Sequence, residues 1–424
     1  MDKFLEKAIN FDHQDQLTNF KSEFFIPDDQ VIYLDGNSLG RLPHKTRGLI
    51  NEVIDQQWGS RLINSWNEKW IGLPNRLSAK IAKLIGARED EVFVGDSTSL
   101  NLYKLIFAAL SLNPDKTRVI SDSLNFPTDL YIVQGLLKQH FVKHKLKLID
   151  GDNLMEVSES MISKLLDHNS ALVTLSHVLF KSSFMYNMKR VNEMVHESKA
   201  LIVWDLSHSV GAVPIDLNKS GADMAVGCTY KYLNGGPGAP AFLYVKKELQ
   251  EQLSNPIWAW FSHVKPFDFA LDYKPVNSIN RFATGTPSVL SLSAIEPGLD
   301  IVLSAGMENL RTKSTRQSEF MIEMIQELLI PLGFSLASPL ESEKRGSHIS
   351  IQHPEAYRIS QAMIEPKNGS KPIIPDFRPP NNIRLGIAPL YNSFIDIYET
   401  VLRLQSIVSQ QEYLAYDLIK KQVT

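Results

Sequence analysis

Two charged residues, Asp205 and Lys231, follow apolar runs that are typical of buried strands. Asp205 ends the run Ala200-Leu-Ile-Val-Trp-Asp, and Lys231 comes after the run that begins at Ala222 and before Tyr-Leu-Asn-Gly-Gly-Pro-Gly. Such runs predict strands covered on both faces, as in a parallel sheet. A carboxylate and an amine at the ends of these strands are costly to bury unless each meets a partner.

A bound pyridoxal 5′-phosphate would supply both partners. Its ring nitrogen, once protonated, pairs with a carboxylate, and its aldehyde is captured by a lysine amine as a Schiff base. The competing interpretation is that Asp205 caps the next helix and Lys231 is a solvated loop lysine; the glycine run after Lys231 favours the cofactor. His208, one turn after Asp205, is then expected to hydrogen-bond that carboxylate and keep it ionised, although a lone histidine is more often structural.

A phosphate group needs its own site on the same edge of the sheet. Gly95-Asp-Ser-Thr-Ser lies between a predicted strand and a predicted helix. Backbone N–H groups at the helix start, with the hydroxyls of Ser97 and Thr98, form a natural phosphate site. An ordinary N-cap by Asp96 or Ser97 is the alternative.

Three residues around the lysine strand complete this picture. Tyr230 directly precedes Lys231, where a phenol can bind phosphate or exchange a proton. Thr286, in Arg281-Phe-Ala-Thr-Gly-Thr-Pro, offers phosphate a hydroxyl and an amide. Cys228 lies on the lysine strand and is expected to be a small buried hydrophobe.

Aromatic residues and one arginine suggest contacts with a ring and with a carboxylate. In Asn125-Phe-Pro-Thr-Asp, Phe126 could lie on the cofactor ring and Asp129 could approach the ring hydroxyl or a phosphate-binding neighbour; a proline turn capped by Thr128 is the alternative. Arg384 lies in a late apolar strand, so it needs an anion. The α-carboxylate of an amino acid fits, and an ion pair with Asp376 or a nearby glutamate competes.

A second aromatic cluster follows the lysine strand. It contains Trp258, Trp260, Phe261 and His263 on one predicted loop. Such a stripe is as often core or subunit interface as it is part of a binding site, so both interpretations stay open.

Composition places the chain among ordinary globular enzymes. It has 424 residues, 43% hydrophobic and 21% charged, with a net charge of −3, so nothing suggests nucleic acid or an anionic membrane as a partner. No uncharged apolar stretch approaches the ~20 residues of a membrane span, and the N-terminus lacks a secretory signal. The single cysteine excludes an intrachain disulfide and a cysteine-rich metal site, and it favours a cytoplasmic location. We expect no metal.

Strands and helices are predicted to alternate along the first two thirds of the chain. Strands are expected at 91–95, 118–121, 145–149, 170–176, 200–205, 223–228 and 241–245, and helices at 45–58, 76–85, 98–111, 128–139, 155–167 and 190–198. Alternation of this kind predicts an α/β fold with a mainly parallel sheet flanked by helices. Ligands in such sheets bind at the carboxyl ends of the strands, which is where the polar groups above fall.

The pattern changes near residue 290. Long helical runs cover 288–304 and 308–329, strand-like segments follow at 346–352 and 382–387, and a last helix spans 392–410. We therefore predict a large cofactor-binding domain at 61–295 and a smaller α+β domain at 296–424, with residues 1–60 packed beside the smaller domain.

With these groups in place, the chain resembles the fold-type I pyridoxal phosphate enzymes of the class V aminotransferase group, and within that group the kynureninases. The segments that carry the resemblance span most of the chain: Tyr33-Leu-Asp-Gly-Asn-Ser-Leu-Gly, Asn125-Phe-Pro-Thr-Asp, Trp204-Asp-Leu-Ser-His-Ser-Val-Gly, Tyr230-Lys-Tyr-Leu-Asn-Gly-Gly-Pro-Gly, Trp260-Phe-Ser-His, and Arg384 with Pro389-Leu-Tyr-Asn-Ser-Phe. The lysine segment identifies only the superfamily, whereas the first and last segments are much more specific.

The resemblance implies hydrolysis of L-kynurenine to anthranilate and L-alanine in tryptophan catabolism, by a homodimer with active sites at the subunit interface. It also implies a seven-stranded sheet. Lys231 would bind the cofactor and move the Cα proton, Asp205 would hold the pyridine nitrogen protonated, and Phe126 would stack on the ring. The implied phosphate ligands are Ser97, Thr98, Tyr230, Trp260 and Thr286, the last two from the partner subunit. The implied substrate contacts are Asn37, Ser38, Trp66, His263 and Arg384.

Some alternatives remain open at this stage. The segment Trp58-Gly-Ser-Arg-Leu-Ile-Asn-Ser-Trp does not decide between kynurenine and its 3-hydroxy form. An aminotransferase or lyase of the same group is the main rival activity. A cysteine desulfurase would need a mobile loop cysteine, and Cys228 is in the wrong place. A binding module without catalysis is the non-enzymatic alternative.

Overall fold

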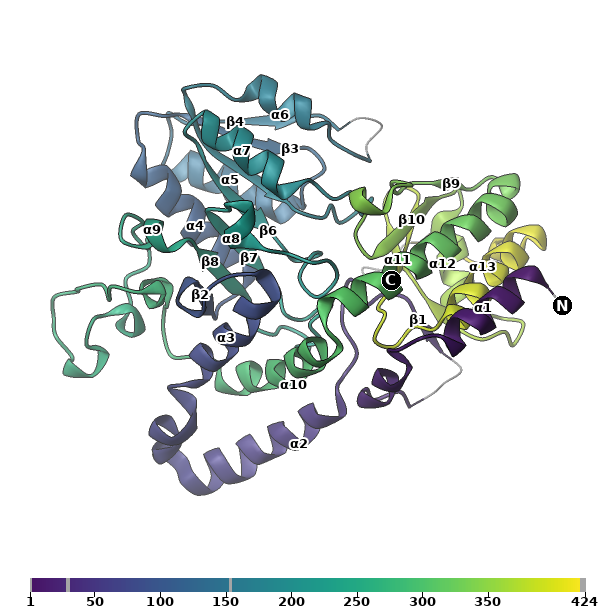
Figure 1. Ribbon diagram of the computed structural model, residues 1–424, viewed down its shortest axis with the longest axis horizontal. Helices are drawn as coiled ribbons and strands as arrows, with labels where there is room; N and C mark the ends of the chain where they lie inside the picture. Colours follow the sequence, from purple (N-terminus) through teal and green to yellow (C-terminus); the bar gives the residue numbers. More distant parts are fainter. Residues whose placement is uncertain (1, 28–30, 152–154, 420–424) are drawn as a thin grey trace.

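The apolar runs of the middle of the chain form one seven-stranded sheet in the computed structural model, which describes residues 2–27, 31–151 and 155–419 (Figure 1). The strand order is β2–β8–β7–β6–β5–β3–β4. All neighbouring pairs are parallel except the two that involve β8. The predicted mainly parallel sheet is confirmed. Its strands are β2 Val92–Val94, β3 Arg118–Asp122, β4 Lys145–Ile149, β5 Ser170–Ser176, β6 Leu201–Asp205, β7 Met224–Gly227 and β8 Phe242–Val245.

Both faces of the central strands β5, β6, β7 and β8 are buried, which explains their apolar runs. On β6, Ile202 and Trp204 join the core on one face, whereas Val203 joins the core on the other. Burial of apolar area at about 25 cal/mol per Å² drives both layers together. Helices α3 Leu73–Ile85 and α7 Met188–Glu197 contribute to the first core, and α4 Thr98–Leu112 and α5 Pro127–Gln139 to the second.

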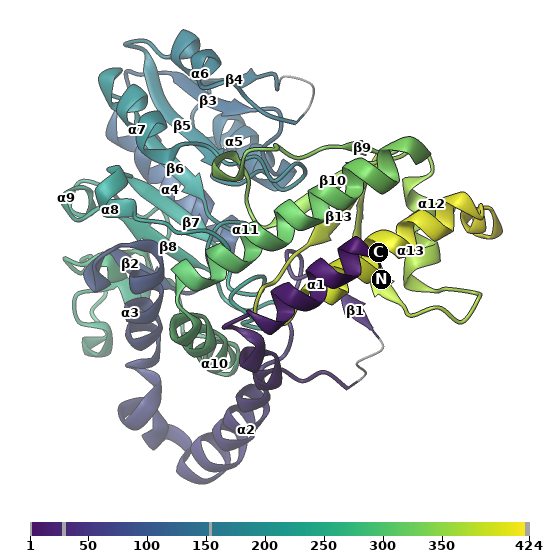
Figure 2. The same cartoon turned by 45° about the vertical axis from the view of Figure 1, so that its right-hand side comes forward.

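A second core surrounds a smaller sheet near the C-terminus. Its four antiparallel strands have the order β12–β13–β10–β9, and a two-stranded parallel pair joins β1 to β11. Helix α1 packs along α13 although the two are at opposite ends of the chain (Figure 2). These elements are α1 Lys3–His13, β1 Ile32–Tyr33, α11 Met307–Met324, β9 Ser335–Leu336, β10 His348–Gln352, α12 Ala356–Ile364, β11 Ile373–Ile374, β12 Asp376–Arg378, β13 Asn382–Gly386 and α13 Phe394–Ser409.

Helices α2 His44–Glu52 and α10 Val289–Ala305 pack on each other, and three short helices lie among the strands of the large sheet. Helix α2 continues into a wider π-type segment, Val53–Arg61. The predicted domain boundaries at residues 60 and 295 both fall inside these helical segments, so the division stays a prediction. The predicted domains also include Met1 and residues 420–424, which lie outside the described residues. The short helices are α6 Glu159–Leu165, α8 Leu217–Ser220 and α9 Lys247–Gln250.

Neither a simple membrane helix nor a metal cluster is found in the part of the chain that the structure describes. No single helix there has the length and apolar character of a membrane span. Only α10 taken together with Met307–Leu332 meets those criteria, and the two are bent by 80°. The same residues contain no group of three or more His, Cys, Asp or Glu side chains that could hold a metal ion.

Candidate active site

Asp205 and Lys231 lie at the carboxyl edge of the large sheet, where the neighbouring parallel strands β6 and β7 end. Asp205 is the last residue of β6 and pairs in register with Val226 of β7, and Lys231 follows four residues after β7 ends. Asp205 is buried, and its Oδ1 accepts a hydrogen bond of 2.8 Å from the Ser207 N–H. Asp205 therefore caps a turn rather than a helix, and Lys231 is half-buried rather than solvated.

His208 contacts the lysine instead of the carboxylate that the sequence predicted. Its Nε2 lies 2.9 Å from Lys231 Nζ, and its Nδ1 is buried without a hydrogen-bond partner. The predicted bond to Asp205 is wrong because the backbone after β6 turns tightly and directs the imidazole toward the neighbouring strand's lysine. Burial, and then the charge of Lys231, hold the pKa of His208 well below its usual range, which favours the neutral imidazole.

Asp129 adds a second carboxyl beside Asp205. It lies in the first turn of α5, is 3% exposed, and its Oδ2 has no hydrogen-bond partner. Burial, and then the charge of Asp205, raise the pKa of Asp129 well above its usual range, while Lys231 acts in the opposite direction. Phe126 is the N-cap of this helix, and its ring lies 5.3 Å from that of Phe180, edge to face. The turn predicted around Pro127 is present, but the helix begins at Pro127, so Thr128 is not its N-cap.

Ser97 and Thr98 begin α4 directly after β2. Ser97 is the N-cap, with its Oγ accepting a 3.3 Å hydrogen bond from the Leu100 N–H, and Thr98 is the first helical residue. The N-cap interpretation is thus confirmed, and it is compatible with anion binding because the first N–H groups of the helix remain directed outward.

A cavity of about 510 Å³ opens beside this helix start. Ser97, Thr98, Tyr230, His263 and Thr286 all line it from one chain. Asp205, Lys231 and Arg384 are not among the described residues that line it, so the cavity covers the predicted phosphate end of the site rather than the lysine. Thr286 reaches it without a partner subunit.

Arg384 is engaged by the protein itself. It is 1% exposed; its Nε donates to Asp376 Oδ2 at 2.5 Å, Nη1 donates to the Phe180 carbonyl at 2.5 Å, and Nη2 donates to Ser38 Oγ at 3.1 Å. The ion pair with Asp376, the alternative interpretation, is therefore present. A contact with a substrate carboxylate stays a prediction.

The turn that carries Asn37 and Ser38 packs against the lysine loop. The Gly40 N–H donates to the Tyr230 carbonyl at 2.8 Å, and a Cβ at Gly40 would meet the Lys231 carbonyl at 2.3 Å. Glycine is required here by this close approach. Asn37 is fully buried, and neither its Oδ1 nor its Nδ2 has a hydrogen-bond partner.

The aromatic residues form a group around Phe261. Its ring lies 6.2 Å from Trp66 and 4.5 Å from Trp260. Trp260 is 39% exposed and does not line the cavity, whereas Phe261 and His263 do. His263 Nδ1 accepts from the Lys265 N–H at 3.0 Å, and its Nε2 is buried without a partner. The cluster is therefore part cavity wall and part surface.

Two buried groups near the site are absent from the sequence predictions. His348, on β10, has its ring 5.6 Å from that of His208, although its segment was interpreted only as a strand. Lys104, on α4, forms an ion pair with Asp96 in the predicted phosphate segment. A single lysine within the apolar stretch 102–110 is the signal that could have identified it.

Comparisons with known proteins agree on family and fold. A family model described as "Kynureninase C-terminal domain" matches residues 310–404. Kynureninase from Pseudomonas fluorescens is 40% identical over 411 residues, 96% of each chain, and that of Burkholderia mallei is 38% identical over 418 residues, 97% of each chain.

Solved structures are similar in fold at low sequence identity. A cysteine desulfurase from Thermococcus onnurineus matches with a TM-score of 0.78 at 18% identity, over 93% of this chain and 98% of that one. A mutant of C-DES, with glycine covalently linked to its pyridoxal phosphate, matches with a TM-score of 0.76 at 15% identity, over 88% of this chain and 96% of that one. The desulfurase chemistry does not follow, because Cys228 is 1% exposed and cannot act as a mobile sulfur carrier.

Proposed function

The chain belongs to the kynureninase family, and from this premise we propose that Lys231 anchors pyridoxal 5′-phosphate while Asp205 pairs with its ring nitrogen. The reaction is the hydrolytic cleavage of the Cβ–Cγ bond of L-kynurenine to anthranilate and L-alanine. One water is consumed: its hydroxyl ends on the carbonyl carbon of the aromatic acid, and a proton ends on Cβ of the alanine.

The residues at the carboxyl edge fit this cofactor. A carboxylate, an amine and a helix start lie at the ends of neighbouring strands, each suited to one end of the molecule. Asp129 Oδ2 and His208 Nδ1 are buried polar atoms without a partner in the described residues, which is costly unless a ligand completes them. When bound, the cofactor's pyridinium ring withdraws electrons from the bonds at the substrate's Cα.

Lys231 is the residue that supports this proposal most strongly. Its Nζ is held by the neutral His208 ring at 2.9 Å, so the amine has a fixed direction before any ligand arrives. We propose that Lys231 also moves the Cα proton, with His208 and Asp129 restricting its position. A fixed direction of the amine favours proton transfer between positioned groups.

Tyr230 is the proposed proton donor. It lines the cavity beside Ser97 and Thr98, and its ring lies 5.9 Å from Lys231 Nζ. Burial, followed by the neighbouring Cys228 and Asp205, raises the pKa of its phenol, so the phenol stays protonated at neutral pH. It can then polarise the substrate's γ-carbonyl or pass a proton to Cβ.

Replacement of this phenol tests the assignment. Tyr230→Phe should lower kcat by about 10²-fold while the cofactor remains bound, because only the proton donor is lost. Steady-state assays with an absorbance spectrum of the bound cofactor measure both quantities. Turnover close to that of the unmodified enzyme would remove the proposed role.

Substrate recognition is proposed to divide between two walls. Arg384, steadied by Asp376 and Ser38, provides positive charge for the α-carboxylate, and the unpartnered amide of Asn37 lies on the same turn as Ser38. Phe126 would stack on the cofactor ring. Trp66 and His263 would contact the aryl group, the latter through its unpartnered Nε2 on the cavity wall.

We propose a homodimer with active sites at the subunit interface. Between α9 and α10 the chain extends away from the sheet at the left of Figure 1. It exposes Trp258 by 70%, Phe269 by 76% and Leu271 fully, more apolar surface than a lone domain usually displays. The same stretch contains Trp260, so pairing there would bring Trp260 to the partner's cavity. The mass of the protein in solution tests this, and a monomer at micromolar concentration would contradict it.

The cellular setting follows from the family's reaction. We propose a cytoplasmic enzyme of tryptophan catabolism, on a path that also supports NAD biosynthesis. Its one cysteine, Cys228, is free and buried, which suits a reducing compartment. Fractionation of cells that express the chain tests this location, and activity confined to the membrane fraction would refute it.

A direct assay tests the proposed function as a whole. Purified protein with kynurenine and pyridoxal phosphate should release anthranilate and alanine in equal amounts, without a keto acid. An aminotransferase would need such an acceptor and would return the cofactor in its amine form. Lys231→Ala is the control, since it should form neither product.

A further inference from the structure

Lys104 is a charged residue buried completely beneath the predicted phosphate segment. Its side chain has no exposed surface, and it lies on α4 among apolar neighbours. Its Nζ donates to Asp96 Oδ2 at 2.8 Å and to the Phe282 carbonyl at 2.7 Å. An ammonium in such a setting is stable only because both contacts are made. Its position is therefore strictly defined.

Asp96, the partner of Lys104, adopts an unfavourable backbone conformation. Its φ is 57°, in the left-handed region that residues other than glycine seldom occupy. Both carboxylate oxygens are engaged, since Oδ1 accepts from Thr284 Oγ1 at 2.8 Å and Oδ2 accepts from Lys104. Its carbonyl also accepts from the Ala241 N–H at 2.8 Å. These contacts hold the residue in a conformation that the chain would otherwise avoid.

The strained residue is itself part of the cavity wall. Asp96 and Thr284 line the cavity, and so do Ser97 and Thr98, which follow Asp96, and Thr286, which follows Thr284 by two residues. The bridge Lys104–Asp96–Thr284 therefore joins the two segments of the wall, which are 188 residues apart in sequence, and sets their separation.

We propose that Lys104, through Asp96 and Thr284, is a positioning residue that shapes the phosphate-binding end of the cofactor site. The inference rests on the proposed function, because it requires that pyridoxal phosphate be the ligand. Lys104 is not a catalytic residue, since its amine is saturated by Asp96 and a carbonyl. It acts by fixing the N–H and hydroxyl groups that the phosphate would meet.

A purely structural role predicts a different result. If Lys104 only stabilised the core, its loss would weaken every ligand of the site equally. If it shapes the phosphate end, its loss weakens binding of pyridoxal phosphate but not of pyridoxal, which lacks the phosphate. The ratio of the two dissociation constants therefore separates the two roles.

The experiment compares Lys104→Met with the unmodified enzyme and with Lys313→Met. Lys313 is a matched control, because it is also buried and contacts one carboxylate, Asp15 at 2.7 Å, and one carbonyl, that of Pro389 at 2.6 Å. Cofactor-free protein is titrated with pyridoxal phosphate and with pyridoxal, and the absorbance of the lysine-bound ligand is recorded. Lys104→Met should raise the dissociation constant for pyridoxal phosphate at least about 10-fold and that for pyridoxal less than about 3-fold. Lys313→Met should leave the ratio unchanged.

A second variant keeps the inference testable if Lys104→Met does not fold. Thr284→Val removes one hydrogen bond to Asp96 and leaves no buried charge unpaired, so it should shift the same ratio by about 3-fold. Equal weakening of both ligands, or no weakening in either variant, overturns the inference. Absence of any lysine-bound ligand in the unmodified enzyme would instead overturn the proposed function itself.

Discussion

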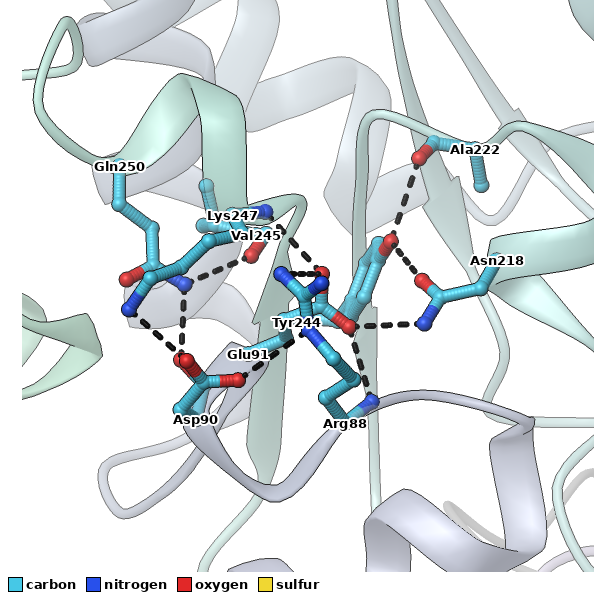
Figure 3. A network of polar contacts seen from close by, with 9 residues as sticks. All are labelled: Arg88, Asp90, Glu91, Asn218, Ala222, Tyr244, Val245, Lys247 and Gln250. Carbon is cyan, nitrogen blue, oxygen red and sulfur yellow. Dashed lines mark hydrogen bonds and ion pairs between the residues drawn. The ribbon is translucent and has the colours of Figure 1, made fainter.

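Buried carboxylates at the two ends of the large sheet differ in how completely their oxygens are hydrogen-bonded. At the amino end of β2, Glu91 is 2% exposed and accepts hydrogen bonds from the Arg88 N–H at 2.8 Å, Asn218 Nδ2 at 3.0 Å and the Lys247 N–H at 3.1 Å (Figure 3). At the carboxyl end, Asp129 is 3% exposed and keeps an oxygen without a partner. The protein completes the first carboxylate, whereas the second keeps one oxygen that the proposed cofactor would contact.

The groups around each carboxylate show the contrast less completely. Near Glu91, the Tyr244 hydroxyl donates to Asn218 Oδ1 at 2.8 Å and Gln250 Nε2 donates to the Asp90 carbonyl at 2.8 Å, whereas Gln250 Oε1 is buried without a partner. Near Asp129, His208 Nδ1 is buried without a partner. Since an unmade buried hydrogen bond costs about 1–3 kcal/mol, such atoms are expected to gather where a ligand binds.

The largest expected effect comes from removing the anchor at the carboxyl end. Lys231→Ala should lower kcat/KM by about 10³-fold or more, because both the covalent attachment and the proton carrier are lost. Its unfolding midpoint without cofactor should stay close to that of the unmodified protein, since the lysine is half-buried and its amine is hydrogen-bonded to His208. A kcat/KM above one tenth of that of the unmodified enzyme would contradict the roles assigned to the two ends of the sheet.

The next largest effect is on the free energy of unfolding, and it concerns Glu91 at the amino end of the sheet. Glu91→Gln places an amide N–H₂ against donors that the carboxylate satisfied, so the free energy of unfolding should fall by about 3 kcal/mol. The kcat of the folded fraction should not change. Urea unfolding and steady-state assays give both values; a loss of kcat without a loss of stability would reverse the roles assigned to the two ends.

Asp129→Asn should have a smaller effect, which lowers cofactor affinity without lowering the free energy of unfolding. The neutral amide removes repulsion from Asp205, so the cofactor-free protein should be as stable as before or up to about 1 kcal/mol more stable. Affinity for pyridoxal phosphate should fall by about 10-fold, because a ligand contact is lost. Thermal unfolding with and without cofactor measures the two effects together. Clear destabilisation of the cofactor-free variant would show that Asp129 is structural.

The last effect appears only below neutral pH and concerns a third carboxyl at this edge. Asp122 ends β3, and burial raises its pKa to about 6, although Tyr186 and the Leu124 N–H donate to it. Between pH 4 and 6 the folded state keeps a proton that the unfolded state releases, so this group's contribution to stability falls as pH rises through that range and is constant above it. Asp122→Asn should remove this pH dependence, which amounts to about 3 kcal/mol across the range. Urea unfolding at several pH values measures it, and parallel curves for the two proteins would contradict it.

Much of the fold could be predicted because the signal is local. The strands 145–149 and 170–176 were predicted with the bounds that the structure gives. Strand 170–176 is buried throughout, and such a run between turns has few other solutions. Burial of Cys228 follows from the same pattern. The domain boundaries are less accessible, because α10 continues across residue 295 without a break in its apolar pattern.

The site was predicted where its residues follow strands and missed where contacts cross the fold. Helical spacing suggested that His208 meets Asp205, but the strand beside it brings Lys231 within 2.9 Å instead. The partners of Lys104 lie 8 and 178 residues away, and nothing in its own segment indicates the second. Strand ends can be found from sequence, whereas the orientation of side chains between strands depends on tertiary packing.

The most direct test of the account is to locate the covalent attachment. The enzyme with bound cofactor is reduced with borohydride, digested, and its peptides are examined by mass spectrometry. The account predicts a pyridoxyl-phosphate adduct on Lys231 and on no other lysine, including the buried Lys104. An adduct on a different side chain, or none on protein that still turns over kynurenine, would contradict it.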